Sequence, residues 1–242
     1  GTTDADWPVG DRHMVKASYS NSEIWHQRFA HVSGRRLKTA VRHVAGMPAD
    51  LPTKCTNHCT TCAMTQQKSK PIQKVADHRL ATATRLSHVS WDLHGPYAIE
   101  GVAGANYVAV AVDAGTAYTW VDILPNKKAR TVAKSFTKYC CQVGIPGCVT
   151  TDNGQEFGRL FRELCDQKGT RSVRSEPFCP ARNGLVERRN SLLKRMSRSM
   201  LVQSGMPMRY WPCTIQTAAY LLNHLPTKRL QGRTPHEAMH GF

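Results

Sequence analysis

The sequence predicts an α/β protein in which a small helical unit precedes a mixed five-stranded sheet with flanking helices. Two observations carry this prediction. From about residue 86 onward, short apolar segments typical of strands alternate with longer segments of helical periodicity. Before that point, histidines and cysteines have the spacing of metal ligands. A chain of 242 residues can bury a sizeable core, so we expect one medium domain beside the smaller unit.

Four side chains of the first unit have the identity and spacing of zinc ligands. WHQRFAH contains two histidines five positions apart, and CTTC contains two cysteines in C-x2-C spacing. The predicted ligands are His26, His31, Cys59 and Cys62. One structural zinc ion prefers such a closed tetrahedron of nitrogen and sulfur, and its binding stabilises a segment that lacks a large core. Two histidines alone are more often surface residues of a helix, but the C-x2-C pair favours zinc, and Cys55 and His58 stay open as alternative ligands.

Three strands and a helix are expected at the start of the main domain. The strands are the apolar segments SHVSWDL, NYVAVAV and AYTWVDIL. The tight turn DAGT, which Asp113 begins, joins the second strand to the third, so the three form an antiparallel meander. Residues 128–143 then repeat apolar side chains at every fourth position, which predicts a helix that ends near Gly144 and Pro146.

Strand and helix continue to alternate in the second half of the domain. CVTTD predicts a fourth strand, and RSVRSE predicts a fifth, short strand. Between them a helix starts near Glu156, where Glu156 itself stabilises the N-terminus. Its inward-facing side chains are predicted to be Phe157, Leu160, Phe161 and Leu164. The last helix, from near Asn183, carries an apolar stripe of Val186, Leu193, Met196 and Met200. This order of elements is that of a ribonuclease H-like fold.

Three carboxylates lie in three separate signatures of this fold. They are Asp92 in SWDLHGP, Asp152 in TDNGQEF and Glu187 in NGLVERRN, the last two 35 positions apart. The first and fourth strands of such a sheet are neighbours, so Asp92 and Asp152 lie close together and Glu187 joins them from the long helix. Two Mg²⁺ ions about 4 Å apart need carboxylates on both sides. Each motif alone is weak, but their order and spacing predict a two-metal site that acts on phosphodiesters.

The charge of the chain predicts a polyanionic partner. Lysine and arginine number 33 against 17 acids, which gives a net charge of +16. Eight of these cations fall between residues 171 and 198, around the third carboxylate. The side chains predicted to bind nucleic acid are Asn183, Arg188, Asn190, Lys194 and Arg198. The plainer readings are a solvated basic helix and a merely basic protein such as a ribosomal one, and composition does not exclude them.

With these motifs in view, the chain resembles the integrase region of a Ty1/copia-type LTR retrotransposon polyprotein from about residue 24 onward. WHQRFAH with CTTC is similar to the pre-integrase zinc segment, and SWDLHGPY, TDNGQEF and PARNGLVERRN are similar to the three acidic motifs. The segment from YWPCTIQ to EAMHGF resembles the helices that follow the core. In this segment Thr234, Pro235 and Glu237 also make a capping box with proline at the first helical position.

The resemblance implies the activity, ligands and partners of an integrase. These are 3′-end processing and strand transfer of element cDNA into host DNA, with two Mg²⁺ or Mn²⁺ ions bound by Asp92, Asp152 and Glu187. It also implies a homo-oligomer, a tetramer, around two cDNA ends. The expected location is a virus-like particle in the cytoplasm and then the host nucleus. A non-catalytic nucleic-acid-binding remnant stays the main alternative, and a ribonuclease H is disfavoured by the zinc segment.

The remaining expectations concern organisation and surroundings. No apolar run is long enough to cross a membrane and no secretory signal is present, so we expect no membrane partner. We also expect no small-molecule substrate. The odd number of nine cysteines favours a reducing compartment. The start without methionine suggests a piece of a longer chain. The expected parts are an N-terminal extension 1–23, a zinc-binding unit 24–66, a linker 67–85, a catalytic core 86–205 and a helical extension 206–242.

Overall fold

The structure, a computed structural model, describes most of the chain. Described are residues 21–51, 59–65, 83–174 and 180–241, without the side chains of 180–183. Cys55 and His58, the alternative zinc ligands, lie outside the described residues, and so does the side chain of Asn183. Most of the predicted linker also lies outside them.

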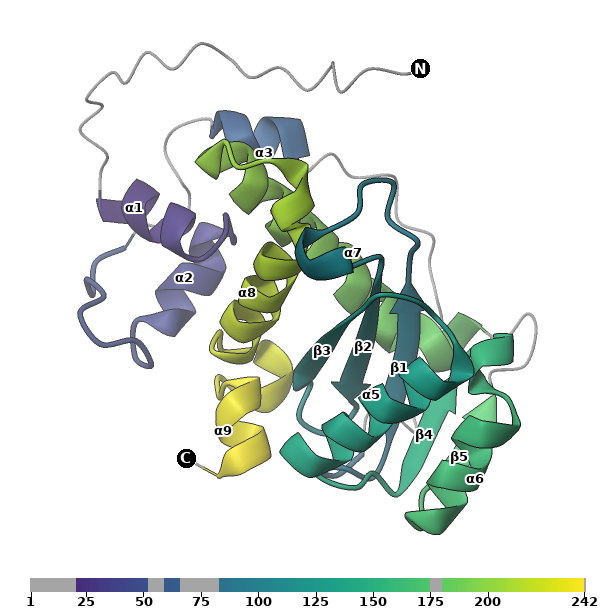
Figure 1. Cartoon of the computed structure of the whole chain (residues 1–242). Helices are drawn as coiled ribbons and strands as arrows, with labels where there is room; N and C mark the ends of the chain where they lie inside the picture. Colours follow the sequence, from purple (N-terminus) through teal and green to yellow (C-terminus); the bar gives the residue numbers. More distant parts are fainter. Residues whose placement is uncertain (1–20, 52–58, 66–82, 175–179, 242) are drawn as a thin grey trace, which may run out of the picture.

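A mixed five-stranded sheet forms the centre of the molecule, as the sequence predicted (Figure 1). Its strands are β1 (Val89–His94), β2 (Tyr107–Asp113), β3 (Thr119–Leu124), β4 (Cys148–Thr151) and β5 (Arg171–Arg174). Their order in the sheet is β3-β2-β1-β4-β5. The first three strands pair antiparallel, whereas β4 pairs parallel with β1 and with β5. The expected neighbourhood of the first and fourth strands is therefore confirmed.

Helices cover both faces of the sheet and continue into the small unit. On one face lie α5 (Ala129–Gln142) and α6 (Arg159–Gln167), and on the other lie α7 (Pro180–Ser204) and α8 (Trp211–Asn223) (Figure 1). The small unit contributes α1 (Asn21–Arg28), α2 (Gly34–Ala40) and α3 (Thr60–Thr65), and the chain closes with α9 (Pro235–His240). Short 3₁₀ turns are η1 (Val102–Gly104), η2 (Gln155–Phe157), η3 (Met208–Tyr210) and η4 (Lys228–Leu230).

Strand periodicity decides which side chains of β1 meet which helix layer. Val89 and Trp91 are fully buried in the cluster beneath α5 and α6, where Trp91 packs against Phe136 and Tyr139 with ring centroids 5.5 and 5.4 Å apart. Alternate residues of a strand point to opposite faces. Asp92, one position further along, therefore points to the face covered by α7. The aromatic core thus fixes the direction of a predicted catalytic carboxylate.

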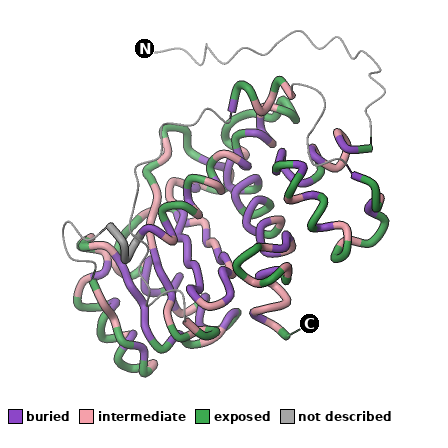
Figure 2. The backbone as a smooth tube through the Cα atoms, turned by 180° about the vertical axis from the view of Figure 1, so that it is seen from behind, coloured by how far each residue is buried: buried purple, intermediate pink, exposed green. Residues whose placement is uncertain are grey.

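The second core joins the sheet to α7, α8 and the small unit. On α7, Val186, Leu193 and Met196 are buried and Met200 packs against the same cluster, so the predicted apolar stripe is confirmed. Leu37 of α2 belongs to this cluster too. Figure 2 follows the buried backbone from the strands into these helices. Continuous burial means that the small unit and the core share one apolar interior.

The helix predicted from Glu156 is interrupted, and one of its side chains points elsewhere. A 3₁₀ turn ends at Phe157, and α6 begins only after Gly158. Phe157 and Phe161 are fully buried as predicted, but Leu160 is 43% exposed, so its inward prediction is wrong. Within α6 the buried face follows Phe161 and Cys165 at i and i+4, and a residue one position away points about 100° aside.

The C-terminal helix has the predicted capping box. Thr234 Oγ1 accepts a hydrogen bond from the backbone N–H of Glu237 at 3.0 Å, and a Glu237 carboxylate oxygen accepts one from the backbone N–H of Thr234 at 2.7 Å. The other carboxylate oxygen lies 3.0 Å from His43 Nδ1, which ties α9 to the small unit. Among the described residues, no helix has the length and apolar character needed to cross a membrane.

Candidate active site and candidate zinc centre

Asp92 is held at the sheet face that α7 covers. Its Oδ2 accepts a hydrogen bond from Asn190 Nδ2 at 2.8 Å, and its Oδ1 accepts one from the backbone N–H of Leu93 at 2.9 Å. Burial, together with the negative charges of Asp152 and Glu187, raises the pKa of Asp92 to about 6. These two carboxylates therefore lie near enough to Asp92 to change its pKa, as the three signatures predicted.

Asp152 follows directly after β4, which pairs with β1. Its Oδ1 accepts a hydrogen bond from the backbone N–H of Gly154 at 3.0 Å, so the DNG signature forms a turn that fixes the carboxylate. Glu187 comes from the exposed side of α7, three residues before the buried Asn190. The strand order and one helix thus bring together carboxylates that are 95 residues apart in sequence, from Asp92 to Glu187.

Two further groups near Asp92 complete its surroundings. Lys194 of α7 is the cation whose charge favours the ionised form of Asp92. His94 Nε2 lies 3.6 Å from Asp92 Oδ2, and burial together with Lys194 lowers the pKa of His94 to about 4, so that its ring is neutral at pH 7. Sequence reasoning missed His94, although its position two residues after Asp92 puts it on the same face of β1.

A pocket of about 600 Å³ opens beside Asp152. Asn153, Gln155 and Glu156 line it on one side, and Lys127 and Lys128 line it on the other, just before α5. These two lysines were not predicted as site residues. The only sequence signal was the pair of adjacent cations in PNKKAR, which does not reveal that the segment faces the fourth strand. The pocket offers cations next to a carboxylate that can hold a divalent ion.

The raised pKa of Asp92 predicts how pH changes the stability of the metal-free protein. The folded state keeps a proton up to about pH 6, whereas the unfolded chain releases it near the ordinary aspartate pKa of 3.8. Between these values the folded state binds more protons, so stability falls as pH rises and then levels off above about pH 6. We expect the melting temperature of the wild type, minus that of Asp92→Asn, to fall across this range. A difference that rises with pH would contradict the raised pKa.

The four predicted zinc ligands form a compact group. The ligand atoms of His26, His31, Cys59 and Cys62 all lie within 4.8 Å of one another. Neighbouring atoms are closer: His26 Nε2 lies 3.1 Å from His31 Nδ1 and 3.2 Å from Cys62 Sγ, and His31 Nδ1 lies 3.2 Å from Cys59 Sγ. In a tetrahedron with ordinary Zn–N and Zn–S bonds these edges measure roughly 3.3 to 3.8 Å. The group therefore has the size and donor set of a structural zinc site.

Hydrogen bonds outside the group orient both imidazoles toward it. The Nδ1 of His26 lies 2.9 Å from the Val32 carbonyl, and the Nε2 of His31 lies 2.7 Å from the Oε1 of Gln203 on α7. Since both partners accept, each ring donates its proton outward and turns an unprotonated nitrogen toward the cysteines. Burial lowers the pKa of His31, which also favours the neutral ring that binds metal.

The residues predicted to bind nucleic acid occupy different sides of α7. Asn190 is 3% exposed and contacts Asp92, so the structure gives it a positioning role. Lys194 and Arg198 are exposed, and Lys194 acts on Asp92. Arg188 is exposed too but lines a pocket toward α2. Contact of any of these residues with nucleic acid stays a prediction.

Comparisons with known proteins identify relatives of most of the chain. It is 27% identical over 245 residues to the retrovirus-related Pol polyprotein from transposon RE2 of Arabidopsis thaliana. This match covers 98% of this chain and 16% of the relative. It is 29% identical over 224 residues to that from transposon TNT 1-94 of Nicotiana tabacum, covering 88% of this chain and 16% of the relative. The chain thus spans about a sixth of these relatives. No protein-family model matches it.

Solved structures share the fold. The catalytic core domain of HTLV-2 integrase, in complex with magnesium, superposes with a TM-score of 0.53 at 21% identity and covers 65% of this chain and 98% of that one. The simian T-cell lymphotropic virus intasome in complex with a PP2A regulatory subunit matches with a TM-score of 0.63 at 17% identity, over 91% of this chain and 72% of that one. This chain is therefore a homologue of the retrovirus-related Pol polyproteins of plant copia-type transposons, and its fold is that of retroviral integrase cores.

Proposed function

We propose that this chain is the integrase part of a retrotransposon polyprotein and joins element cDNA to host DNA by 3′-end processing and strand transfer. The observation that carries the proposal is the proximity of Asp92, Asp152 and Glu187 beside the adjacent inner strands β1 and β4. The homology to transposon Pol polyproteins and the fold of integrase cores support the same assignment. In these terms the catalytic core runs from 86 to 205, between the zinc unit 24–66 and the helical extension 206–242.

The carboxylates have the donors and surroundings that divalent ions require. Asp92 is partly buried beside two more carboxylates, and their mutual repulsion favours a cation between them. Two Mg²⁺ or Mn²⁺ ions bound here would activate a water or a 3′-hydroxyl and stabilise the leaving oxygen of an in-line displacement at phosphorus. The HTLV-2 integrase core, which has the same fold, was solved with magnesium. A single zinc ion in the His26, His31, Cys59 and Cys62 group would serve structure alone, because four protein ligands leave no open position.

The chain's own residues would position the ligands and the DNA. Asn190 and the Leu93 N–H fix both oxygens of Asp92, and the turn at Gly154 fixes Asp152. Lys194 lies near Asp92, so its ammonium group can bind the phosphate that is being attacked. Lys127 and Lys128 can hold the strand that passes Asp152. Neutral His94 adds no positive charge that would compete with the metal ions.

The proposal extends to assembly and location. One structural neighbour was solved in a trimeric form and the other as an intasome, which supports a homo-oligomer. The oligomer that we propose is a tetramer that holds two cDNA ends. The acceptor would be host DNA in the nucleus, and the chain would reside before that in a cytoplasmic virus-like particle. Such an assembly requires a polycation, and the net charge of +16 meets that requirement.

A strand-transfer assay tests the proposal. The purified chain is incubated with Mg²⁺ and labelled oligonucleotides that carry the ends of its element, and joined products are counted. We expect products from the wild type and none from Glu187→Gln, which keeps the size of the side chain but removes its charge. Glu163→Gln on the exposed side of α6 is the matched control and should retain activity. Equal products from Glu187→Gln and the wild type would refute the assignment of this site.

A further inference from the structure

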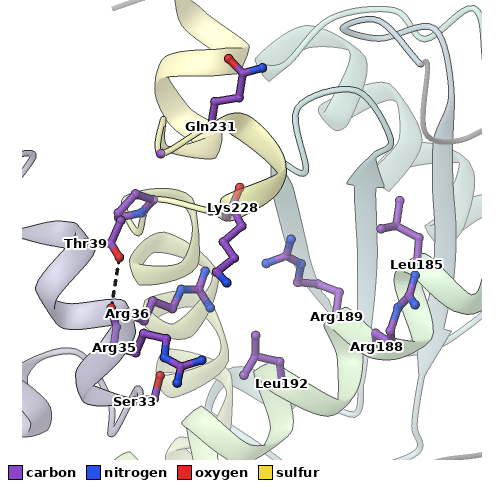
Figure 3. A pocket seen from close by; sticks show the side chains of 13 residues that line it. Ser33, Arg35, Arg36, Thr39, Leu185, Arg188, Arg189, Leu192, Lys228 and Gln231 are labelled. Carbon is purple, nitrogen blue, oxygen red and sulfur yellow. Dashed lines mark hydrogen bonds between the residues drawn. The ribbon is translucent and has the colours of Figure 1, made fainter. Parts of the chain in front are cut away.

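A second basic pocket lies on the other flank of α7, between the small unit and the C-terminal segment. Its volume is about 810 Å³. It is lined from α2 by Arg35 and Arg36, from α7 by Arg188 and Arg189, and from the start of η4 by Lys228. Figure 3 shows the side chains of Arg36, Arg189 and Lys228 pointing from these three elements into the same space. None of the described residues that line it is acidic.

The cations of this pocket repel one another. Arg36 and Arg189 carry like charges and point into the same pocket from α2 and α7, and Lys228 adds a third positive charge from η4. One guanidinium nitrogen of Arg189 donates to the Ala117 carbonyl at 3.0 Å, which holds the group in place without neutralising it. Like charges that converge in a partly buried space destabilise the fold unless an anion joins them. The arrangement therefore fits a ligand that carries several negative charges.

The wall of the pocket is apolar. Leu185 and Leu192 lie at i and i+7 on α7, and Pro226 adds a buried ring. Thr227, which also lines the pocket, has a buried hydroxyl without a hydrogen-bond partner among the described residues. Pockets for organic ligands measure about 300 to 1,000 Å³ and combine apolar walls with a few polar groups. The pocket is thus suited to a ligand with an apolar ring as well as anionic groups.

We infer that this pocket binds a nucleotide, with its phosphates between Arg36, Arg189 and Lys228 and its base against Leu185 and Leu192. Guanidinium groups bind phosphate oxygens in a two-pronged geometry and also stack on bases. The nucleotide can be free or part of a nucleic-acid strand, since both present the same chemistry. The site is independent of the proposed catalysis, because Asn190 faces Asp92 while Arg188 and Arg189 face α2.

Thermal shift and calorimetric titration with adenosine triphosphate test this inference, in buffer without added divalent cations so that the carboxylate site takes no part. We expect the nucleotide to raise the melting temperature and to bind at least about ten-fold more tightly than either adenosine or inorganic tripolyphosphate. Arg36→Gln and Lys228→Gln should each weaken binding by about ten-fold or more, because each removes a charge-assisted contact. Arg162→Gln, an exposed arginine of α6, is the matched control and should bind like the wild type.

The unliganded variants give a second readout that a purely structural role would not give. Since Arg36 and Arg189 place like charges in one pocket, Arg36→Gln should melt at the same temperature as the unliganded wild type or higher. Binding of the nucleotide by Arg36→Gln as tightly as by Arg162→Gln would overturn the site, and tripolyphosphate as tight as the nucleotide would overturn the base contact. Competition by a 5′-phosphorylated single-stranded decanucleotide supports a strand as the source, and nucleotide binding without such competition supports a free nucleotide.

Discussion

Asp92→Asn is expected to reduce strand transfer by at least about a thousand-fold, the loss that follows when several kcal/mol of metal-assisted stabilisation is removed. The charges of both neighbouring carboxylates raise the pKa of Asp92, so Asp92 is the candidate for the ligand that bridges the two metal ions. An amide has one oxygen and no charge, and it cannot bridge two cations. The measurement is the strand-transfer assay at saturating Mg²⁺, with Asp50→Asn, an exposed aspartate, as the matched control.

The same substitution should stabilise the metal-free protein at pH 7. Burial and the charges of Asp152 and Glu187 raise the pKa of Asp92 to about 6, so at pH 7 the folded state carries an ionised group that it disfavours. A shift of this size corresponds to about 2 or 3 kcal/mol. The amide of Asn190 can adapt by rotating, because its Oδ1 is buried without a partner among the described residues. A higher melting temperature with lost activity is therefore the expected pair of results. A lower melting temperature would instead indicate a structural carboxylate.

The elements that sequence periodicity predicted best are those with a two-sided environment. β1 alternates Trp91 toward the aromatic core and Asp92 toward α7, and α7 repeats Val186 and Leu193 on its buried stripe. In both elements the position of a side chain in the sequence fixes which face of the element it lies on. The pattern in the sequence therefore agrees with the packing. The prediction failed at Leu160, where the break at Gly158 sets a new helical register that apolarity alone does not reveal.

The candidate sites were predictable to the extent that their residues form local signatures. The ligand spacing of CTTC and the DNG turn can be read from a few consecutive residues. The contact of Asn190 with Asp92 joins residues 98 positions apart, and the pocket of Arg36, Arg189 and Lys228 joins three elements. Neither group follows a spacing rule, because the packing of separate elements brings its residues together: α7 against β1 for the contact, and α2 and η4 against α7 for the pocket. In the sequence, the three cations of the pocket are indistinguishable from solvated surface cations.

Removal of the zinc site should unfold the small unit. We expect about one zinc ion per purified chain and its loss in the double variant Cys59→Ser, Cys62→Ser, since structural zinc contributes on the order of 10 kcal/mol to small domains. The expected melting temperature falls by many degrees, because the segment of α1 and the segment of α3 lose the metal ion that joins them. Metal analysis and the fluorescence of Trp25, which packs against the core next to the site, measure both effects. The exposed cysteines provide the matched control, Cys141→Ser with Cys213→Ser.

The loss should reach α7 but leave the carboxylates in place. His31 is hydrogen-bonded to Gln203 near the end of α7, and Leu37 belongs to the apolar core that α7 shares with the small unit. Amide hydrogen exchange should therefore rise in the last turns of α7. Asp92 and Asn190 lie on β1 and in the first half of α7, where the sheet supplies the packing. A variant that keeps stoichiometric zinc would contradict the ligand set and assign Cys55 or His58 to the site. A variant that loses zinc but melts like the wild type would mean that the shared core alone holds the unit together.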